Sequence, residues 1–156
     1  MKKLVVYYSR TGNTKQIGEE IATALGADLD EIVDQKSRKG PIGWLKSGRD
    51  AIRQTLTDIT VQKSPENYDM IIIGTPIWSG KMTPAVRTYL TNYPFANKNV
   101  AFFTTQGSDN AIKTVTEMES MVAPTKVIGT LNIQQEDIKT SKYKARLPAF
   151  VEQLKQ

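Results

Sequence analysis

Apolar segments bounded by turn residues alternate along the chain with segments in which apolar side chains recur every three or four positions. The first pattern is typical of buried strands and the second of amphipathic helices. Their alternation predicts repeated β-α-β units and an α/β fold. The expected strands are Lys3–Tyr8, Ala27–Val33, Tyr68–Thr75, Asn99–Thr105 and Lys126–Ile133.

Helices are expected between and after these strands, each with one apolar stripe. The stripes consist of Ile17, Ile21 and Leu25; of Val86, Leu90 and Tyr93; of Ile112, Val115, Met118 and Val122; and of Tyr143, Leu147, Phe150, Val151 and Leu154. Pro148 requires the last helix to begin near that position or to bend. The segment Gly40–Leu56 is expected to be a loop that leads into the second helix.

The polarity of the strands predicts their order in the sheet. The first, third and fourth are apolar on both faces and therefore central, because helices must cover them on both sides. Asp28 and Asp30 give the second strand one polar face, and Thr130 and Asn132 do the same for the fifth, so these two belong at the edges. With right-handed crossovers, the simplest arrangement is a doubly wound, five-stranded parallel sheet of order 2-1-3-4-5. Its ligand site is expected beyond the carboxyl ends of strands one and three.

Length and composition narrow the class of protein. A chain of 156 residues predicts a single domain over residues 1–156. The apolar run in "MKKLVVYYSR" is too short for a signal peptide or a membrane span, so we expect a soluble, cytoplasmic protein without membrane insertion.

Cysteine and histidine are both missing from the sequence. This excludes disulfides, a thiolate nucleophile, an imidazole base and the usual zinc sites, so any redox chemistry must come from a bound cofactor. We expect neither a metal site nor catalytic side chains. The net charge of +5 suggests anionic ligands or partners, but it is too diffuse to indicate nucleic acid.

The loop after the first strand, Ser9–Thr14, has the sequence "SRTGNT". Its three hydroxyls, one amide and one glycine precede a helix, where free N–H groups converge, and this combination predicts a cradle for a terminal phosphate. It lacks the spacing of a Walker A loop or of a dinucleotide fingerprint. Arg10 and Lys15 flank a helix start that favours negative charge, which indicates an anionic ligand. An ordinary N-cap turn is the alternative.

The chain resembles the flavodoxin family over essentially its whole length. The segment "SRTGNT" is similar to the family's phosphate loop, S/T-x-T-G-x-T, and follows the first strand as in that family. The resemblance implies a flavodoxin-like three-layer αβα sandwich and non-covalently bound FMN. It assigns the FMN phosphate to the hydroxyls, amide and main chain of Ser9, Arg10, Thr11, Gly12, Asn13 and Thr14.

The loop "GTPIWSGKMTPAV" resembles the family's loop at the isoalloxazine ring. Trp78 is expected to stack on the ring, although it could instead pack on the following helix. By the resemblance, the Ser79–Gly80 peptide is the candidate redox sensor that hydrogen-bonds the flavin N5. The residues expected to contact the cofactor here are Thr75, Pro76, Ile77, Trp78, Ser79 and Gly80.

The loop "TTQGSDNA" supplies groups for the pyrimidine edge of the ring, namely Thr105, Gln106, Gly107 and Asp109. Asp109 could equally be an N-cap of the fourth helix. Members of the family often carry a tyrosine here that stacks on the outer flavin face, and this sequence has none. That face is therefore either open or covered by another part of the chain.

The segment Lys36–Arg53 is basic, with a single acid, Asp50, against six cations: Lys36, Arg38, Lys39, Lys46, Arg49 and Arg53. On a helix, Lys46, Arg49 and Arg53 share a face opposite the stripe of Leu45, Ile52 and Leu56. The basic face is either merely solvated or a docking site for an acidic partner or an anionic cosubstrate such as NAD(P)H. Trp44 beside it is either a helix anchor or a lid over the flavin.

Three functions follow from the resemblance. In the first, the protein carries electrons on FMN between redox partner proteins. In the second, it is an FMN-dependent NAD(P)H oxidoreductase similar to quinone reductases. A flavin-sensing module without turnover is the third. The short chain leaves no long insertion for a substrate lid and favours the carrier.

Overall fold

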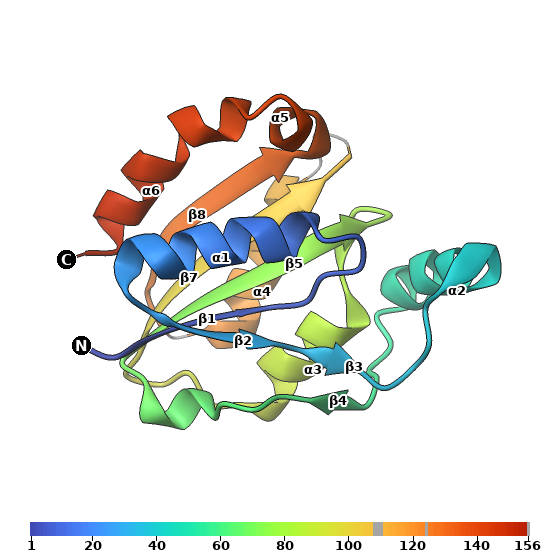
Figure 1. The fold of residues 1–156 in the computed structure, drawn as a ribbon. Helices are drawn as coiled ribbons and strands as arrows, with labels where there is room; N and C mark the ends of the chain where they lie inside the picture. Colours follow the sequence, from blue (N-terminus) through green and yellow to red (C-terminus); the bar gives the residue numbers. More distant parts are fainter. Residues whose placement is uncertain (108–110, 124, 156) are drawn as a thin grey trace.

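The computed structural model describes residues 1–107, 111–123 and 125–155 of the chain. Its main sheet has the order β2-β1-β5-β7-β8 with all of these pairings parallel, which confirms the predicted order 2-1-3-4-5 (Figure 1). In chain order, the strands of this path are β1 (Lys3–Tyr7), β2 (Asp28–Glu31), β5 (Met70–Trp78), β7 (Asn99–Gln106) and β8 (Val127–Gln134).

Helices cover both faces of the sheet, as a doubly wound fold requires. One face carries α1 (Asn13–Leu25) and α6 (Leu147–Gln153), and the other carries α3 (Pro84–Asn92) and α4 (Ala111–Val122) (Figure 1). Ile71 and Ile72 of β5 are consecutive and point to opposite faces, yet both are fully buried. The central strands are therefore sealed on both sides, as their continuous apolar sequences predict.

The second predicted strand is divided in two. The chain leaves the main sheet after β2, and β3 (Val33–Asp34) pairs antiparallel with β4 (Ile59–Thr60). Asp34 is thereby carried away from the main sheet, toward the base of the segment that follows.

The expectation that Asp30 faces water was wrong. The residue is buried, and its Oδ2 accepts hydrogen bonds from the backbone N–H groups of Gln62 and Lys63 at 2.9 and 2.7 Å. Two peptide donors thus replace the water that an edge position would otherwise provide.

The stripes of the first, third, fourth and last predicted helices are buried or half-buried except at Ile112, although Tyr143 lies in a separate 3₁₀ helix before the last helix. In α4 the buried face runs through Ala111, Val115, Met118 and Val122, and Ile112 is 76% exposed because it lies one position off that face. The last helix begins at Leu147 and takes Pro148 into its first turn, so it starts there rather than bending.

Three short helical segments were not predicted: α5 (Gln135–Lys139) and the 3₁₀ helices Pro65–Asn67 and Lys142–Ala145. Every helix among the described residues is too short or too polar to cross a membrane.

The segment expected to begin as a loop is helical from its start, forming α2 (Gly40–Ile52) with Pro41 in its first turn. It stands outside the two helical layers, beyond the carboxyl ends of the central strands (Figure 1). The short strand β6 (Lys81–Met82) pairs back on the end of β5 and forms a hairpin near α2.

Candidate functional site

A cavity of about 630 Å³ lies at the carboxyl ends of β1, β5 and β7, where the winding of the sheet changes direction. This is the position expected for a ligand in an open α/β sheet, and the volume is within the range of small-molecule sites. Its walls come from the loop after β1, the end of β5, the end of β7 and one side of α2.

The predicted phosphate loop forms the first wall, where Arg10, Thr11, Asn13 and Thr14 line the cavity. Gly12 occupies the N-cap position of α1 with φ of 96°, a conformation that favours glycine. The helix start has no side-chain cap and no acidic residue in its first turn. Its first N–H groups are therefore available to an anion, whereas an ordinary turn would satisfy them with a capping side chain.

Ser9 supports this loop from behind rather than lining the cavity. Its Oγ accepts a hydrogen bond from the Gly12 N–H at 3.2 Å, and the Gly12 carbonyl accepts from the Gln16 N–H at 2.9 Å. Both interactions fix the course of the backbone around Gly12. Neither Ser9 nor Gly12 lines the cavity.

Thr14 connects the phosphate loop to the end of β7. Its buried Oγ1 lies 2.8 Å from Oγ1 of Thr105, and both residues line the cavity. The two hydroxyls bring together residues that are far apart in the sequence. The structure thus joins the first and third predicted loops at one point.

The second predicted loop is a tight hairpin between β5 and β6. Ser79 and Gly80 have φ of 51° and 74°, and two successive positive φ values are typical of the type I′ turn. The Gly80 carbonyl accepts a hydrogen bond from Thr114 Oγ1 at 2.9 Å, which ties the turn to α4. Ser79 lines the cavity and Gly80 does not.

Pro76, Ile77 and Trp78 of β5 also line the cavity, whereas Thr75 does not. Thr75 is fully buried, where its Oγ1 donates to the Pro76 carbonyl at 2.9 Å and accepts from the Thr83 N–H at 3.3 Å. Its place is beneath the site, where it stabilises the strand end.

Trp78 both packs against the protein and faces the cavity. Its ring meets the ring of Tyr8 edge to face, with centroids 5.6 Å apart, and the guanidinium carbons of Arg10 and Arg38 lie 5.9 and 5.7 Å from its centroid. Burial, reinforced by the Asp34 carboxylate, raises the pKa of Tyr8 to about 12, so this neighbour is neutral. Packing fixes Trp78 while part of its surface remains available to a ligand.

The third predicted loop is only partly at the cavity. Thr105 lines it, Gln106 is buried behind it and Gly107 is exposed. The Oε1 atom of Gln106 has no hydrogen-bond partner in the described part of the chain. Asp109, for which ligand binding and helix capping were both expected, lies outside the described residues.

The fourth wall is α2, which the motifs did not predict as part of the site. Trp44 is 66% exposed, so it is no buried anchor. The apolar stripe opposite the basic face is not buried either, since Leu45, Ile52 and Leu56 are 68%, 60% and 55% exposed. The cavity residues of α2 and its C-cap are Trp44, Leu45, Ser47, Gly48, Arg49, Ile52 and Arg53, and Gln135 of α5 completes the lining.

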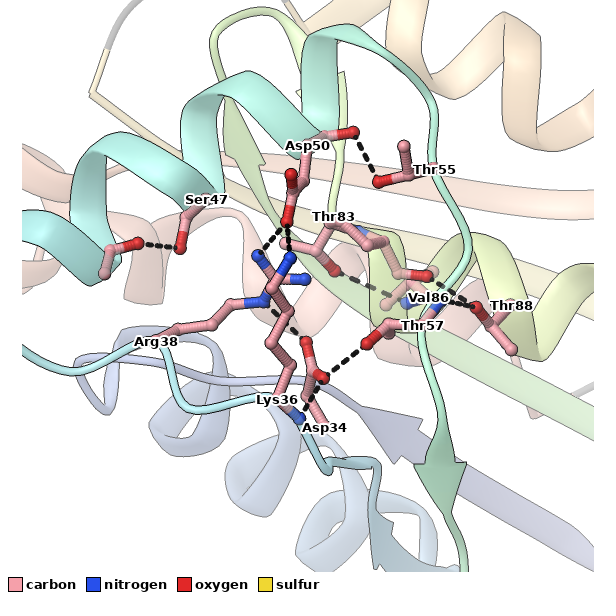
Figure 2. Close-up of polar contacts among 12 residues, drawn as sticks. Asp34, Lys36, Arg38, Ser47, Asp50, Thr55, Thr57, Thr83, Val86 and Thr88 are labelled. Atoms are coloured by element: carbon pink, nitrogen blue, oxygen red, sulfur yellow. Dashed lines mark hydrogen bonds and ion pairs between the residues drawn. The ribbon is translucent and has the colours of Figure 1, made fainter.

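A buried ion cluster explains why α2 turns its apolar side chains outward (Figure 2). Arg38 is buried, and its Nε donates to Asp34 Oδ2 at 2.6 Å while its Nη1 donates to Asp50 Oδ2 at 3.0 Å. Lys36 Nζ donates to the same Asp50 oxygen at 2.6 Å. Asp50 must therefore face inward, and Arg38 is not part of an exposed docking surface as expected.

The cluster is charged despite its burial. Burial alone would raise the pKa of Asp50, but hydrogen bonds from Lys36 and Arg38 lower it. Burial likewise opposes the charge of Arg38, and its hydrogen bonds to Asp34 and Asp50 raise its pKa. Removing one partner would leave an uncompensated buried charge, which is strongly destabilising.

Close backbone packing holds α2 at both the cluster and the hairpin. A Cβ on Gly43 would lie 2.4 Å from the carbonyl carbon of Arg38, so this approach requires glycine. A Cβ on Gly48 would lie 3.3 Å from Ser79 Oγ, which places α2 directly against the β5–β6 turn. The helix is therefore a fixed wall of the cavity.

Comparisons with known proteins agree with the fold. A sequence model described as flavodoxin matches residues 2–145. The crystal structure of a flavoprotein from Lactobacillus acidophilus in complex with FMN is 27% identical, with a TM-score of 0.72, and the match covers 92% of this chain and 98% of that chain.

Two structures with lower sequence identity share the fold. A protein from Bacteroides uniformis assigned as a flavoprotein is 24% identical, with a TM-score of 0.77 and coverage of 93% of this chain and 97% of that chain. One from Bacteroides eggerthii is 22% identical, with a TM-score of 0.73 and coverage of 96% and 97%. None of the curated proteins compared with the chain matches it. Because the family model extends over nearly all of the sequence, the chain belongs to the flavodoxin family.

Proposed function

We propose that the protein binds FMN without a covalent bond and carries electrons on it between redox partners. The observation that carries the proposal is a single cavity that is lined both by the loop before α1 and by the end of β5 with its turn. The lining residues concerned are Arg10, Thr11, Asn13, Thr14, Trp78 and Ser79. One cavity thus provides an anion site and an aromatic ring face, as a molecule with a phosphate and a flat ring system requires.

The residues of the cavity fit FMN. The uncapped start of α1 offers backbone N–H groups to the phosphate, with the hydroxyls of Thr11 and Thr14 nearby. No carboxylate lines the cavity within the part of the chain that the structure describes, so nothing there repels the phosphate. The similarity to the FMN complex of the Lactobacillus acidophilus flavoprotein supports the same cofactor.

Bound FMN would supply the redox chemistry, since it accepts either one or two electrons. The chain would bind and orient it: the cradle would hold the phosphate, and Trp78 would provide a surface for the ring. The Ser79–Gly80 turn would present its peptide to the ring edge. The turn requires a positive φ at both residues, and a bulky residue at position 80 would disfavour that backbone conformation.

Cofactor identity is tested by titrating the apoprotein with FMN, FAD and riboflavin and following flavin emission. FMN should bind most tightly, because the cradle is built for a terminal phosphate. Equal retention of FAD or riboflavin would contradict the assignment.

The carrier function is tested by stepwise reduction of the FMN-loaded protein, followed by absorbance, with and without NADPH. A carrier should accept electrons from a chemical reductant or a partner reductase and remain oxidised when NADPH alone is added. Rapid bleaching by NADPH alone would contradict the carrier and favour an oxidoreductase.

The second candidate function is an FMN-dependent NAD(P)H oxidoreductase. The specific observation in its favour is α2, which adds apolar and basic side chains to the cavity beyond those of the phosphate cradle. For the carrier, the exposed basic segment around Lys39 and Lys46, which lie outside the cavity, remains the proposed docking site of an acidic partner.

A further inference from the structure

Helix α2 presents large apolar side chains to water within the cavity. Trp44, Leu45 and Ile52 are between 60% and 68% exposed, and all three line it. Grouped apolar exposure of this kind is unusual for a surface without a binding function. These side chains offer a flat aromatic molecule a surface that the phosphate cradle does not provide.

The same wall carries unneutralised positive charge. Arg53 makes no ion pair among the described residues, and Arg49 has only a contact of 3.5 Å with Asp50 Oδ1, a carboxylate that Arg38 and Lys36 already neutralise. The described lining contains no acid. Guanidinium groups bind phosphate, carboxylate and sulfonate through paired N–H donors, so the wall favours an anion.

The wall is separate from the cradle and preformed. The cradle lies between β1 and α1, whereas the wall lies on a helix fixed by the buried pairing of Arg38 with Asp34 and Asp50. Gly48 places this helix beside Ser79, where the flavin ring is expected. A molecule on the wall would therefore lie close to the ring without competing for the phosphate site.

Concavity distinguishes the wall from the rest of the helix surface. Ile42 and Leu56 are exposed but do not line the cavity, and neither do the cations Lys39 and Lys46. A docked protein would contact these outer side chains first. The residues within the cavity are better suited to a small molecule.

We propose that the α2 wall is a subsite for a flat aromatic cosubstrate that carries a phosphate, carboxylate or sulfonate group. This rests on FMN occupying the cradle and on the second candidate function, the oxidoreductase, because a carrier that exchanges electrons only with proteins needs no cosubstrate subsite. Trp44, Leu45 and Ile52 contact the rings of the cosubstrate, and Arg49 and Arg53 contact its anionic group. A nicotinamide dinucleotide phosphate and an anionic quinone share this chemistry.

The test is calorimetric titration of the FMN-loaded protein with anthraquinone-2-sulfonate, with the neutral 2-(hydroxymethyl)anthraquinone and, in a separate arm, with NADP⁺. FMN loading is checked first by flavin absorbance, so that failure of the FMN assignment is recognised separately. The sulfonate should bind roughly tenfold more tightly than the neutral quinone. Binding of NADP⁺ alone identifies a dinucleotide site. Absence of binding by both anions, or equal binding of the two quinones, overturns the proposal.

The charge contribution is isolated with two double variants of equal net charge. Arg49→Gln with Arg53→Gln should abolish the preference for the sulfonate, whereas Lys39→Gln with Lys46→Gln should retain it, because these lysines do not line the cavity. If both variants lose the preference for the sulfonate equally, the anion is attracted by the overall positive charge of the protein, and the proposed subsite is overturned.

The aromatic contact is isolated with Trp44→Ser and the control Ile42→Ser. Trp44→Ser should weaken both quinones roughly tenfold while FMN affinity changes less than twofold. Ile42→Ser should leave the affinities for both quinones and for FMN unchanged. A loss of FMN affinity as large as the loss of quinone affinity would assign the wall to the flavin itself and overturn the proposal.

Discussion

The phosphate loop and α2 face one another across a single cavity, yet different interactions position them. The loop Ser9–Thr14 joins a buried strand to a helix, and its geometry follows from one glycine and short polar side chains. Helix α2 has little apolar burial and depends on the charged contacts of Arg38 with Asp34 and Asp50. One wall is thus set by the sheet and the other by a buried ion cluster.

This difference suggests separate roles for the two walls: the loop Ser9–Thr14 for binding the cofactor, and α2 for selecting the molecule that binds beside it. A wall fixed by the sheet is as stable as the core, and it suits a cofactor that stays bound. A wall fixed by a few ion pairs can be detached without unfolding the sheet. Changes to the cluster should therefore affect α2 first, and changes to the loop should affect the cofactor first.

The largest effect is expected for Arg38→Met. It leaves Asp34 without its buried cation and Asp50 with only Lys36 and the longer contact of Arg49, which should favour opening of α2 by on the order of 3 kcal/mol. Hydrogen exchange should show loss of protection in residues 40–52 and retained protection in β1, β5 and β7.

Lys36→Met is the matched control. The side chain of Lys36 is 45% exposed, although it contacts the same Asp50 oxygen. Exposed ion pairs contribute about 1 kcal/mol or less, so α2 should keep most of its protection. Equal loss in the two variants, or loss of protection throughout the sheet in Arg38→Met, would remove the distinction between the two walls.

Acid should open the same wall in the unaltered protein. Because the pKa of Asp50 is lowered in the folded state, its contribution to stability is complete above its ordinary value of 3.8 and is lost as the pH falls through the lowered value. Protection of residues 40–52 should therefore decline below about pH 4. Asp58→Asn, which alters an exposed carboxylate, should leave this profile unchanged, and a shifted profile would exclude Asp50 as the controlling group.

Gly12→Val tests the loop in the same way. At φ of 96° a β-branched residue is strained by about 1–3 kcal/mol, and its side chain would hinder approach of a phosphate. FMN affinity should fall at least tenfold and riboflavin affinity much less. Gly26→Val is the control, because Gly26 at the other end of α1 also has positive φ and open space around it. If Gly26→Val weakens FMN as much, strain in the helix rather than the cradle is responsible.

The strand order and the glycine turn before α1 could be predicted because they depend on local sequence. Fully apolar strands must be central, and a glycine with hydroxyl residues before a helix indicates an anion site. The division of the second strand could not be predicted, since it depends on pairing of Val33 with Thr60. Burial of Asp30 likewise depends on backbone donors more than thirty positions away.

The wall formed by α2 was missed for a related reason. Its apolar stripe predicts an inward face, and the rule fails because Asp50 and Ser47 take the buried side instead. The sequence did contain a signal: Gly43 and Gly48 recur on the helix beside Ser47, as expected where a backbone approaches its neighbours closely. Asp50 pairs with Lys36 and Arg38, which are near it in the sequence, but the burial of these contacts depends on the fold.

The smallest expected effect compares the two cations that flank the start of α1. Arg10 lines the cavity and lies over the ring of Trp78, whereas Lys15 does not line it and pairs with Glu19 at 3.9 Å. Charges at a helix terminus contribute about 0.3–1 kcal/mol and are screened by salt. Arg10→Gln should therefore weaken FMN about two- to fivefold at low salt and little at high salt, while Lys15→Gln should have less effect at both.

Fluorescence titrations at two salt concentrations separate the cases, and thermal unfolding with and without FMN provides a second readout. Loss of Arg10 relieves repulsion at the helix start but also removes its contact with Trp78, so the stability of the apoprotein should change little. The difference in melting temperature between the FMN-bound protein and the apoprotein should become smaller. Equal effects of the two substitutions would mean that the phosphate responds to the general positive field. A response to Arg10→Gln alone would mean that placement at the cavity wall, rather than net charge, makes a cation useful to the cofactor.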